Sequence, residues 1–340
     1  MESCIVRNNE TIYAIYKEKS TIRIRKRNDD KWNEAKIIAK NTMGGFSIMG
    51  CPEGEPVILY QDSKGNLMAA RGDNPHRMVL RNTSEGSSPL HIKGILRENT
   101  IQLFYNRDYI SESYITEQHR REDGSWSKAV PLDKYISNAN LTKLVSIGDN
   151  YILFYSKNVP EQQIGYREIG RYSIGEFKML YSTGYKILDY SLALTCDEIH
   201  LCAVVLTNRG NRLIYIKKDN GGISKTKILY DGFVKGCHIS IENSKIVIIF
   251  STILGNNRII SYDMGNTFRR TESIEQFVFN KTVFYDYTKQ SPDNFVASEL
   301  ITDVNFPYEV RYCPFINNSF NEVEKLKKEI EKLKGLKRGE

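Results

Sequence analysis

A short apolar segment recurs along this chain at an almost constant interval, and this repetition limits the possible folds more than any other feature. Neighbouring copies end 44 to 50 residues apart in an aromatic or small residue, and six of these end residues are Tyr16, Tyr60, Tyr105, Tyr155, Val205 and Phe250. A weaker seventh copy, NFVAS, ends at Ser298. Self-similarity at a period of roughly 20–50 residues is typical of solenoids, propellers and other arrays.

Each repeat contains four short segments separated by turns. An apolar segment and a polar turn, for example Arg97-Glu98-Asn99, precede the recurring strand. A more alternating segment such as TIRIRKR follows it, and a second turn then leads into the most polar segment, as in WNEAKII. Polar turns of this length between apolar runs indicate hairpins, and the grading from continuously apolar to polar indicates increasing exposure. The pattern predicts four antiparallel strands per repeat, which is the blade of a β-propeller.

We therefore predict an all-β protein, a seven-bladed β-propeller over residues 1–318, followed by a short amphipathic helix over residues 319–340. The seventh repeat, with KTVFYDY, FVASEL and YEVRY, has no convincing fourth strand after Phe315. Six blades with an additional segment is the alternative. A propeller must hide its last strand edges, so the N-terminal segment CIVR is a candidate to pair across the closure of the ring.

The repeat pattern stops after Ser319, and a helical pattern begins. Val323, Leu326, Ile330 and Leu333 follow spacings of 3, 4 and 3 residues, which is the apolar seam of a short coiled coil. About two heptads are too few to be stable alone. Three outcomes stay open for this tail: self-association into a dimer or trimer, docking against the side of the propeller, and disorder in isolation.

The composition is that of an ordinary soluble protein and argues against several functional classes. The net charge of +7 over 340 residues is scattered along the chain, so no nucleic-acid partner is expected. No apolar run approaches the length of about 18 residues that a membrane helix needs, and the first residues lack a signal-peptide pattern, which predicts a cytoplasmic location. The six cysteines have no C-x-x-C spacing and are expected to be reduced. The five histidines have no metal-ligand spacing, so we expect no metal or other cofactor.

One turn carries a family resemblance. Residues Ser261–Phe268, SYDMGNTF, resemble the Asp-box, the S-x-D-x-G-x-T-W/F turn of sialidase-type propellers. The resemblance implies a turn in which the aspartate accepts backbone N–H groups, glycine supplies a positive φ, and the ring packs beneath. Asp-boxes also occur in many non-enzymes, so the resemblance concerns the fold. The F/Y-R-I-P motif of sialidases is absent, since Arg23 is the nearest match and lacks the proline, and we expect no enzymatic activity.

Polar residues on the innermost strands define a candidate ligand site. The innermost strands of propeller blades line a central channel, so polar side chains on them converge across it. If they point inward, they form a basic funnel for an anion or an acidic peptide. The candidate residues are His91, Lys93, Lys143, Tyr190, Lys235 and His238.

Three functional hypotheses follow. The first is a non-enzymatic interaction module, in which the helical tail joins protomers through its apolar seam or tethers a protein partner. The second is a glycan-binding, lectin-like propeller, for which Trp32 and Trp126 at equivalent turns are the candidate contacts. The third is a divergent glycosidase, which would need two acids and an arginine at the mouth of the channel.

Overall fold

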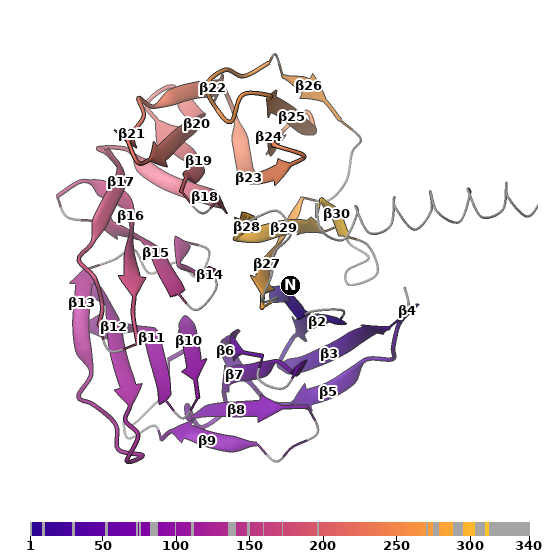
Figure 1. Cartoon of the computed structure of the whole chain (residues 1–340), viewed down its shortest axis with the longest axis vertical. Coiled ribbons are helices and arrows are strands. Elements are labelled where there is room, and N and C mark those ends of the chain that lie inside the picture. The colour runs from indigo at the N-terminus through magenta and orange to yellow at the C-terminus, as the bar shows by residue number, and fades with distance from the viewer. Residues whose placement is uncertain are drawn as a thin grey trace, which may run out of the picture.

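Six sheets, built mainly of antiparallel strands, surround a common centre in the computed structural model of this chain (Figure 1). The structure describes residues 2–312 with gaps at 9–10, 29–30, 52–53, 73, 75, 82–87, 99, 110–111, 135–140, 148–149, 159, 172, 196, 270, 275–278, 288–294 and 303–309. Each sheet begins with the innermost strand and continues outward through strands that follow one another in the chain. In blades 1 and 5 the outermost position is shared by two short strands, which both pair with the third strand. We call the sheets blades 1 to 6. The predicted all-β propeller architecture is confirmed.

The first three blades occupy residues 2–134. Blade 1 contains β1 (Glu2–Asn8), β2 (Thr11–Glu18), β3 (Thr21–Asn28), β4 (Lys31–Trp32) and β5 (Lys36–Ala39). Blade 2 contains β6 (Met43–Gly50), β7 (Val57–Gln61), β8 (Leu67–Arg71) and β9 (Arg77–Leu80). Blade 3 contains β10 (Ile92–Arg97), β11 (Thr100–Tyr109), β12 (Glu112–Arg120) and β13 (Val130–Lys134).

The other three blades occupy residues 143–273. Blade 4 contains β14 (Lys143–Ile147), β15 (Asn150–Asn158), β16 (Gln162–Ile169) and β17 (Lys178–Thr183). Blade 5 contains β18 (Lys186–Thr195), β19 (Ile199–Thr207), β20 (Gly210–Asp219), β21 (Gly222–Ile223) and β22 (Lys227–Asp231). Blade 6 contains β23 (Val234–Glu242), β24 (Lys245–Thr252), β25 (Asn256–Ser261) and β26 (Glu272–Ser273).

The expected grading of burial across a blade is confirmed. The second strands β19 and β24 are buried along most of their length, whereas the outer strands β13 and β22 have only exposed or half-buried residues. Apolar side chains from neighbouring blades pack against each other, so the hydrophobic clusters lie between sheets rather than within one. This packing leaves the hairpin ends of the strands to form the two faces of the ring.

The seventh repeat does not form a separate blade in the described residues, which corrects the seven-bladed prediction. Its strands are β27 (Asn280–Asp286), β28 (Phe295–Ala297), β29 (Glu299–Thr302) and β30 (Val310–Tyr312). β27, β29 and β30 extend the sheet of blade 1, because β27 pairs in parallel with β1, and β28 pairs with β18 of blade 5. Figure 1 shows β27 and β28 near the middle of the ring. The predicted pairing of CIVR across the closure is therefore confirmed.

The turn at Ser261–Phe268 makes the hydrogen bonds that its sequence predicts. Thr267 donates its backbone N–H to Asp263 Oδ1 at 2.8 Å and its hydroxyl to Oδ2 at 2.6 Å. These bonds lower the pKa of Asp263 to about 2. Gly265 has a φ of 88°, and the Phe268 ring packs edge-on against Tyr215 at a centroid distance of 4.8 Å. The turn thus anchors blade 6 to blade 5.

Some predictions lie outside the described residues. They include the helix over residues 319–340 with its seam residues Val323, Leu326, Ile330 and Leu333, and the thiols of Cys196 and Cys313. The cysteines that are described, Cys4, Cys51, Cys202 and Cys237, are free thiols. Within the described part of the chain, no helix is long and apolar enough to span a membrane.

Candidate functional site

A pocket of about 710 Å³ lies between blades 3 and 4. Blade 3 contributes the ends of β10, β11 and β12, and blade 4 contributes the turn that follows β16. These ends lie on the face at which the first and second strands of each blade are joined, which we call the hairpin face. The pocket is lined by Ile95, Arg97, Thr100, Ile101, Gln102, Glu117, His119, Arg120, Arg121, Glu122, Asp123, Arg171, Ser173 and Ile174.

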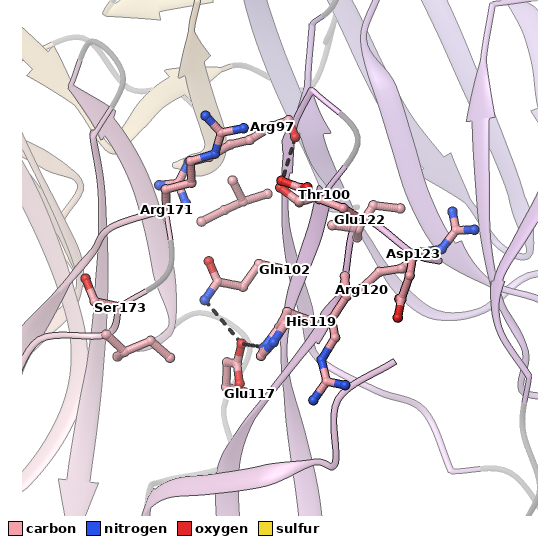
Figure 2. Close-up of a pocket in the computed structure, with 14 residues that line it drawn as sticks. Arg97, Thr100, Gln102, Glu117, His119, Arg120, Glu122, Asp123, Arg171 and Ser173 are labelled. Atoms are coloured by element: carbon pink, nitrogen blue, oxygen red, sulfur yellow. Dashed lines mark hydrogen bonds and ion pairs between the residues drawn. The ribbon is translucent and has the colours of Figure 1, made fainter. Parts of the chain in front are cut away.

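A hydrogen-bonded group of three side chains, Gln102, Glu117 and His119, forms one wall of this pocket (Figure 2). Gln102 Nε2 donates to Glu117 Oε1 at 3.2 Å, and His119 Nδ1 lies 3.0 Å from the same oxygen. Glu117 is only 5% exposed. Gln102 Oε1 is buried, and it has no hydrogen-bond partner among the described residues. Figure 2 shows this oxygen on the side of the amide that faces away from Glu117. The wall therefore contains a buried acceptor that no described residue uses.

The strand registers show how unusual this wall is among the blades. In each blade the second strand pairs with the third, so equivalent positions can be matched. The position of Gln102 is held in the other blades by Tyr13, Val57, Ile152, His200 and Val247. The position of Glu117 is held in the other blades by Ile24, Ala69, Tyr166, Tyr215 and Arg258. Only blade 3 of the six described blades has a carboxylate there, and burying a carboxylate costs stability.

The equivalent polar group in blade 5 is satisfied from within the protein. His200 Nδ1 lies 2.7 Å from the hydroxyl of Tyr215, and its Nε2 lies 3.1 Å from Glu198 Oε2. Lys217 forms an ion pair with the other oxygen of Glu198 at 2.6 Å. This group has no unused acceptor of the kind that Gln102 presents in blade 3, so we regard it as structural.

The remaining walls of the pocket are held by contacts between blades 3 and 4. Arg97 donates to the carbonyl oxygens of Gly170 at 2.7 Å and Ile169 at 2.8 Å, and it therefore ties β10 to the turn after β16. Arg171 of blade 4 pairs with Glu98 of blade 3. Both guanidinium groups are engaged, so the pocket is not a simple basic patch. It combines an aliphatic lining with a fixed set of donors and acceptors.

The second candidate region is a cavity of about 910 Å³ where the innermost strands begin. We call this side of the ring the entry face. Of the predicted channel residues, His91, Lys93, Lys143 and Lys235 line the cavity, whereas Tyr190 and His238 do not line it and are fully buried. Tyr190 donates its hydroxyl to the carbonyl of Leu141 at 2.8 Å, and burial raises its pKa.

Two carboxylates that the sequence did not suggest join this region, Asp189 of β18 and Glu299 of β29. Lys281 of β27 donates to Asp189 Oδ1 at 2.7 Å and lies 3.0 Å from Glu299 Oε2, and Lys143 pairs with Glu299. Burial alone would raise the pKa of Glu299, but its two lysine partners lower it to about 2. The strands of the seventh repeat are thus held in the centre by an alternating network of buried charges.

His238 of β23 lies close to this network, but neither of its ring nitrogens has a hydrogen-bond partner among the described residues. The ring is fully buried. Burial lowers the pKa of His238 to about 3, compared with 6.5 for an exposed histidine. The side chain is therefore neutral in the folded protein at neutral and mildly acidic pH.

We expect the His238→Leu substitution to reduce the acid sensitivity of the protein. Between pH 6.5 and about 3, the unfolded chain binds a proton at His238 that the folded protein does not bind, so stability falls as the pH falls. One such group changes the free energy of unfolding by about 1.4 kcal/mol per pH unit. Urea unfolding at pH 7, 6 and 5 should show this extra slope in the natural protein and its loss in the variant. Equal slopes would contradict the assignment.

Trp32 and Trp126 occupy equivalent turns, as predicted, but each is half-buried against a hydrophobic cluster. Trp32 packs against a cluster that joins blades 5, 6 and 1, and Trp126 packs against the cluster between blades 2 and 3. Neither residue lines the pocket between blades 3 and 4. Their role as glycan contacts stays a prediction. In the described residues, no group of three or more His, Cys, Asp or Glu side chains is arranged to hold a metal ion.

Known proteins resemble this chain in fold. Neither a family model nor a curated protein matches the sequence. The BP39L lectin from Burkholderia pseudomallei has a TM-score of 0.53 and 10% sequence identity, over 78% of this chain and 81% of that chain. A fungal lectin from Aleuria aurantia, described as a six-bladed β-propeller with a novel mode of fucose recognition, has a TM-score of 0.46 and 11% identity, over 81% of this chain and 95% of that chain. At 10% identity, the likeness to the BP39L lectin concerns the propeller fold alone.

Proposed function

We propose that this protein is a non-enzymatic, glycan-binding propeller, and that the pocket between blades 3 and 4 is its binding site. The observation that carries the proposal is the pair Gln102 and Glu117. Both polar side chains stand at strand positions that are mostly apolar in the other blades, and one of their acceptors is unused. Positions that break the local pattern at a cost in stability are expected at functional sites.

The chemistry of the pocket suits sugar hydroxyl groups, which both donate and accept hydrogen bonds. Gln102 Oε1 and the carboxylate of Glu117 can accept, and the hydroxyl of Ser173 can do either. Ile95, Ile101 and Ile174 supply an aliphatic surface for the C–H groups of a sugar ring. Small-molecule pockets commonly combine a mostly apolar lining with a few fixed polar groups, within roughly 300–1,000 Å³.

The arrangement of acidic residues supports binding without turnover. Glycoside hydrolysis needs two carboxyl groups that flank the scissile bond. Among the residues that line this pocket, Glu117 is the buried carboxylate, whereas Glu122 and Asp123 are exposed in a turn. Asp123 is also occupied, since its Oδ1 accepts the backbone N–H of Ser125 at 2.8 Å.

The interaction-module hypothesis remains a separate prediction. Self-association or partner tethering through residues 319–340 falls outside the described residues. We favour glycan binding over it, because the pocket between blades 3 and 4 combines fixed hydrogen-bonding side chains with an aliphatic lining.

A glycan array tests the proposal. We expect the natural protein to bind a subset of the arrayed glycans, which should include fucosylated and other neutral structures. The Glu117→Gln variant should lose most of this signal, because the carboxylate can no longer accept at both oxygens. Glu198→Gln is the matched control, since Glu198 contacts a histidine in the equivalent part of blade 5 outside this pocket. The absence of any binding by the natural protein would rule the proposal out.

A further inference from the structure

The cavity on the entry face carries more positive than negative charge. Four lysines line it, Lys93, Lys143, Lys235 and Lys281, together with the carboxylates of Asp189 and Glu299. Asp189 already pairs with Lys281, and Glu299 pairs with both Lys143 and Lys281. Among the described residues that line the cavity there are two more lysines than carboxylates, and an excess of positive charge attracts an acidic ligand.

An unused hydrogen-bonding group also lines this cavity. Thr142 precedes β14 and is only 6% exposed. Its hydroxyl oxygen is buried and has no hydrogen-bond partner among the described residues. A buried hydroxyl without a partner costs free energy, and an acceptor group of a bound ligand would remove this cost.

An exposed apolar strip borders the cavity on blade 6. Phe233 is 52% exposed, Ile253 is 68% exposed, and Leu254 is 93% exposed. Val234 pairs with Thr252 across the hairpin of β23 and β24, so Phe233 and Ile253 lie next to each other on the entry face. Lys235 and Ser251, two residues from this pair along each strand, line the cavity itself. A charged cavity thus continues into an apolar surface, and exposed apolar patches of this kind mark interaction sites.

We propose that this cavity and its apolar border bind an acidic peptide segment of a partner protein. Glutamate or aspartate side chains of the segment would occupy the basic lining near Lys235 and Thr142, and an adjacent aliphatic side chain would pack on Phe233, Ile253 and Leu254. The volume of about 910 Å³ is much larger than an inorganic anion needs, and it is in the range of pockets that hold larger ligands, roughly 300–1,000 Å³. The site lies on the opposite face from the glycan pocket, so the two proposals do not depend on each other.

Fluorescence anisotropy with short labelled peptides tests this inference on the full chain. The probe is the hexapeptide EELLEE, and the comparison peptides are QQLLQQ and EESSEE. We expect the full chain to bind EELLEE and to bind both comparison peptides more weakly. The Lys235→Glu variant should weaken EELLEE binding at least about tenfold, because it inverts a charge at the cavity. The Leu254→Ser variant should weaken it about threefold through lost apolar contact.

The matched control is Lys225→Glu. Lys225 is an exposed lysine on the outer part of blade 5 and does not line the cavity. Lys225→Glu changes the net charge by the same amount as Lys235→Glu, and it should leave EELLEE binding unchanged. Absence of EELLEE binding at millimolar peptide, or an equal loss in both charge variants, would overturn the proposal. Equal binding of EELLEE and EESSEE, with full competition by citrate, would identify a site for small anions and would also overturn it.

Discussion

Replacement of Glu299 by alanine is expected to lower the free energy of unfolding by about 3–5 kcal/mol, because it leaves buried charges without their partner. Glu299 is the carboxylate that Lys143 and Lys281 share in the centre of the ring. Their side chains are 6% and 16% exposed, so water can compensate only in part. The loss would also remove the ion pairs that tie β29 to Lys143 of β14 and Lys281 of β27. Urea unfolding of the variant and the natural protein measures the difference.

The matched control is Glu272→Ala, which removes an ion pair of similar length on the surface. Glu272 lies 2.8 Å from Arg258, and both side chains are more than one-third exposed, so its loss should cost less than about 1 kcal/mol. The pKa of Glu299 is lowered from 4.5 to about 2, so its contribution is fully present above pH 4.5 and is lost as the pH falls towards 2. A cost for Glu299→Ala no larger than that of the control would show that the central network does not hold the closing strands.

The double substitution Gln102→Leu with Glu117→Leu is expected to abolish glycan binding without loss of stability. Hydrogen bonds to a charged group contribute roughly 1.5–3 kcal/mol, so removal of both side chains should weaken binding at least about 100-fold. Apolar residues stand at many of the equivalent positions in other blades, including Val57, Ile152 and Val247 for Gln102. The free energy of unfolding should therefore stay the same or rise by up to about 2 kcal/mol.

Two measurements on the same protein separate function from folding in this experiment. Isothermal titration with the strongest glycan from the array gives the loss of affinity, and urea unfolding gives the change in stability. Reduced stability together with reduced binding would indicate that Gln102 and Glu117 support the blade rather than the ligand. Unchanged binding would place the glycan site elsewhere.

The repeat architecture could be predicted from the sequence because it depends on local patterns. The apolar second strands, the polar turns and the graded exposure all follow from neighbouring residues, and the structure confirms them. The number of blades could not be obtained in this way. The seventh repeat has the strand pattern of the others, but β27 finds a parallel partner in β1, which lies more than 270 residues earlier in the chain. Periodicity identifies strands, and it does not identify the edge with which each strand pairs.

The candidate sites depended more strongly on the fold. The sequence predicted Trp32 and Trp126 as glycan contacts because they are aromatic and lie at equivalent turns. In the structure both rings are half-buried between blades. A signal for the blade 3 pocket was present, since Gln102 interrupts the apolar run TIQLFY. Glu117 gave no comparable signal, because its burial becomes clear only when the registers are matched. Asp189 and Glu299 are far apart in sequence, and only the closing strands bring them to the same lysine.

A crystal structure of the protein with the strongest-binding sugar from the array tests the central claim most directly. We predict sugar density in the pocket between blades 3 and 4, with ring hydroxyls in hydrogen-bond distance of Gln102 Oε1 and the Glu117 carboxylate. Density at another interface between blades, or against Trp32 or Trp126 with this pocket empty, would contradict the account.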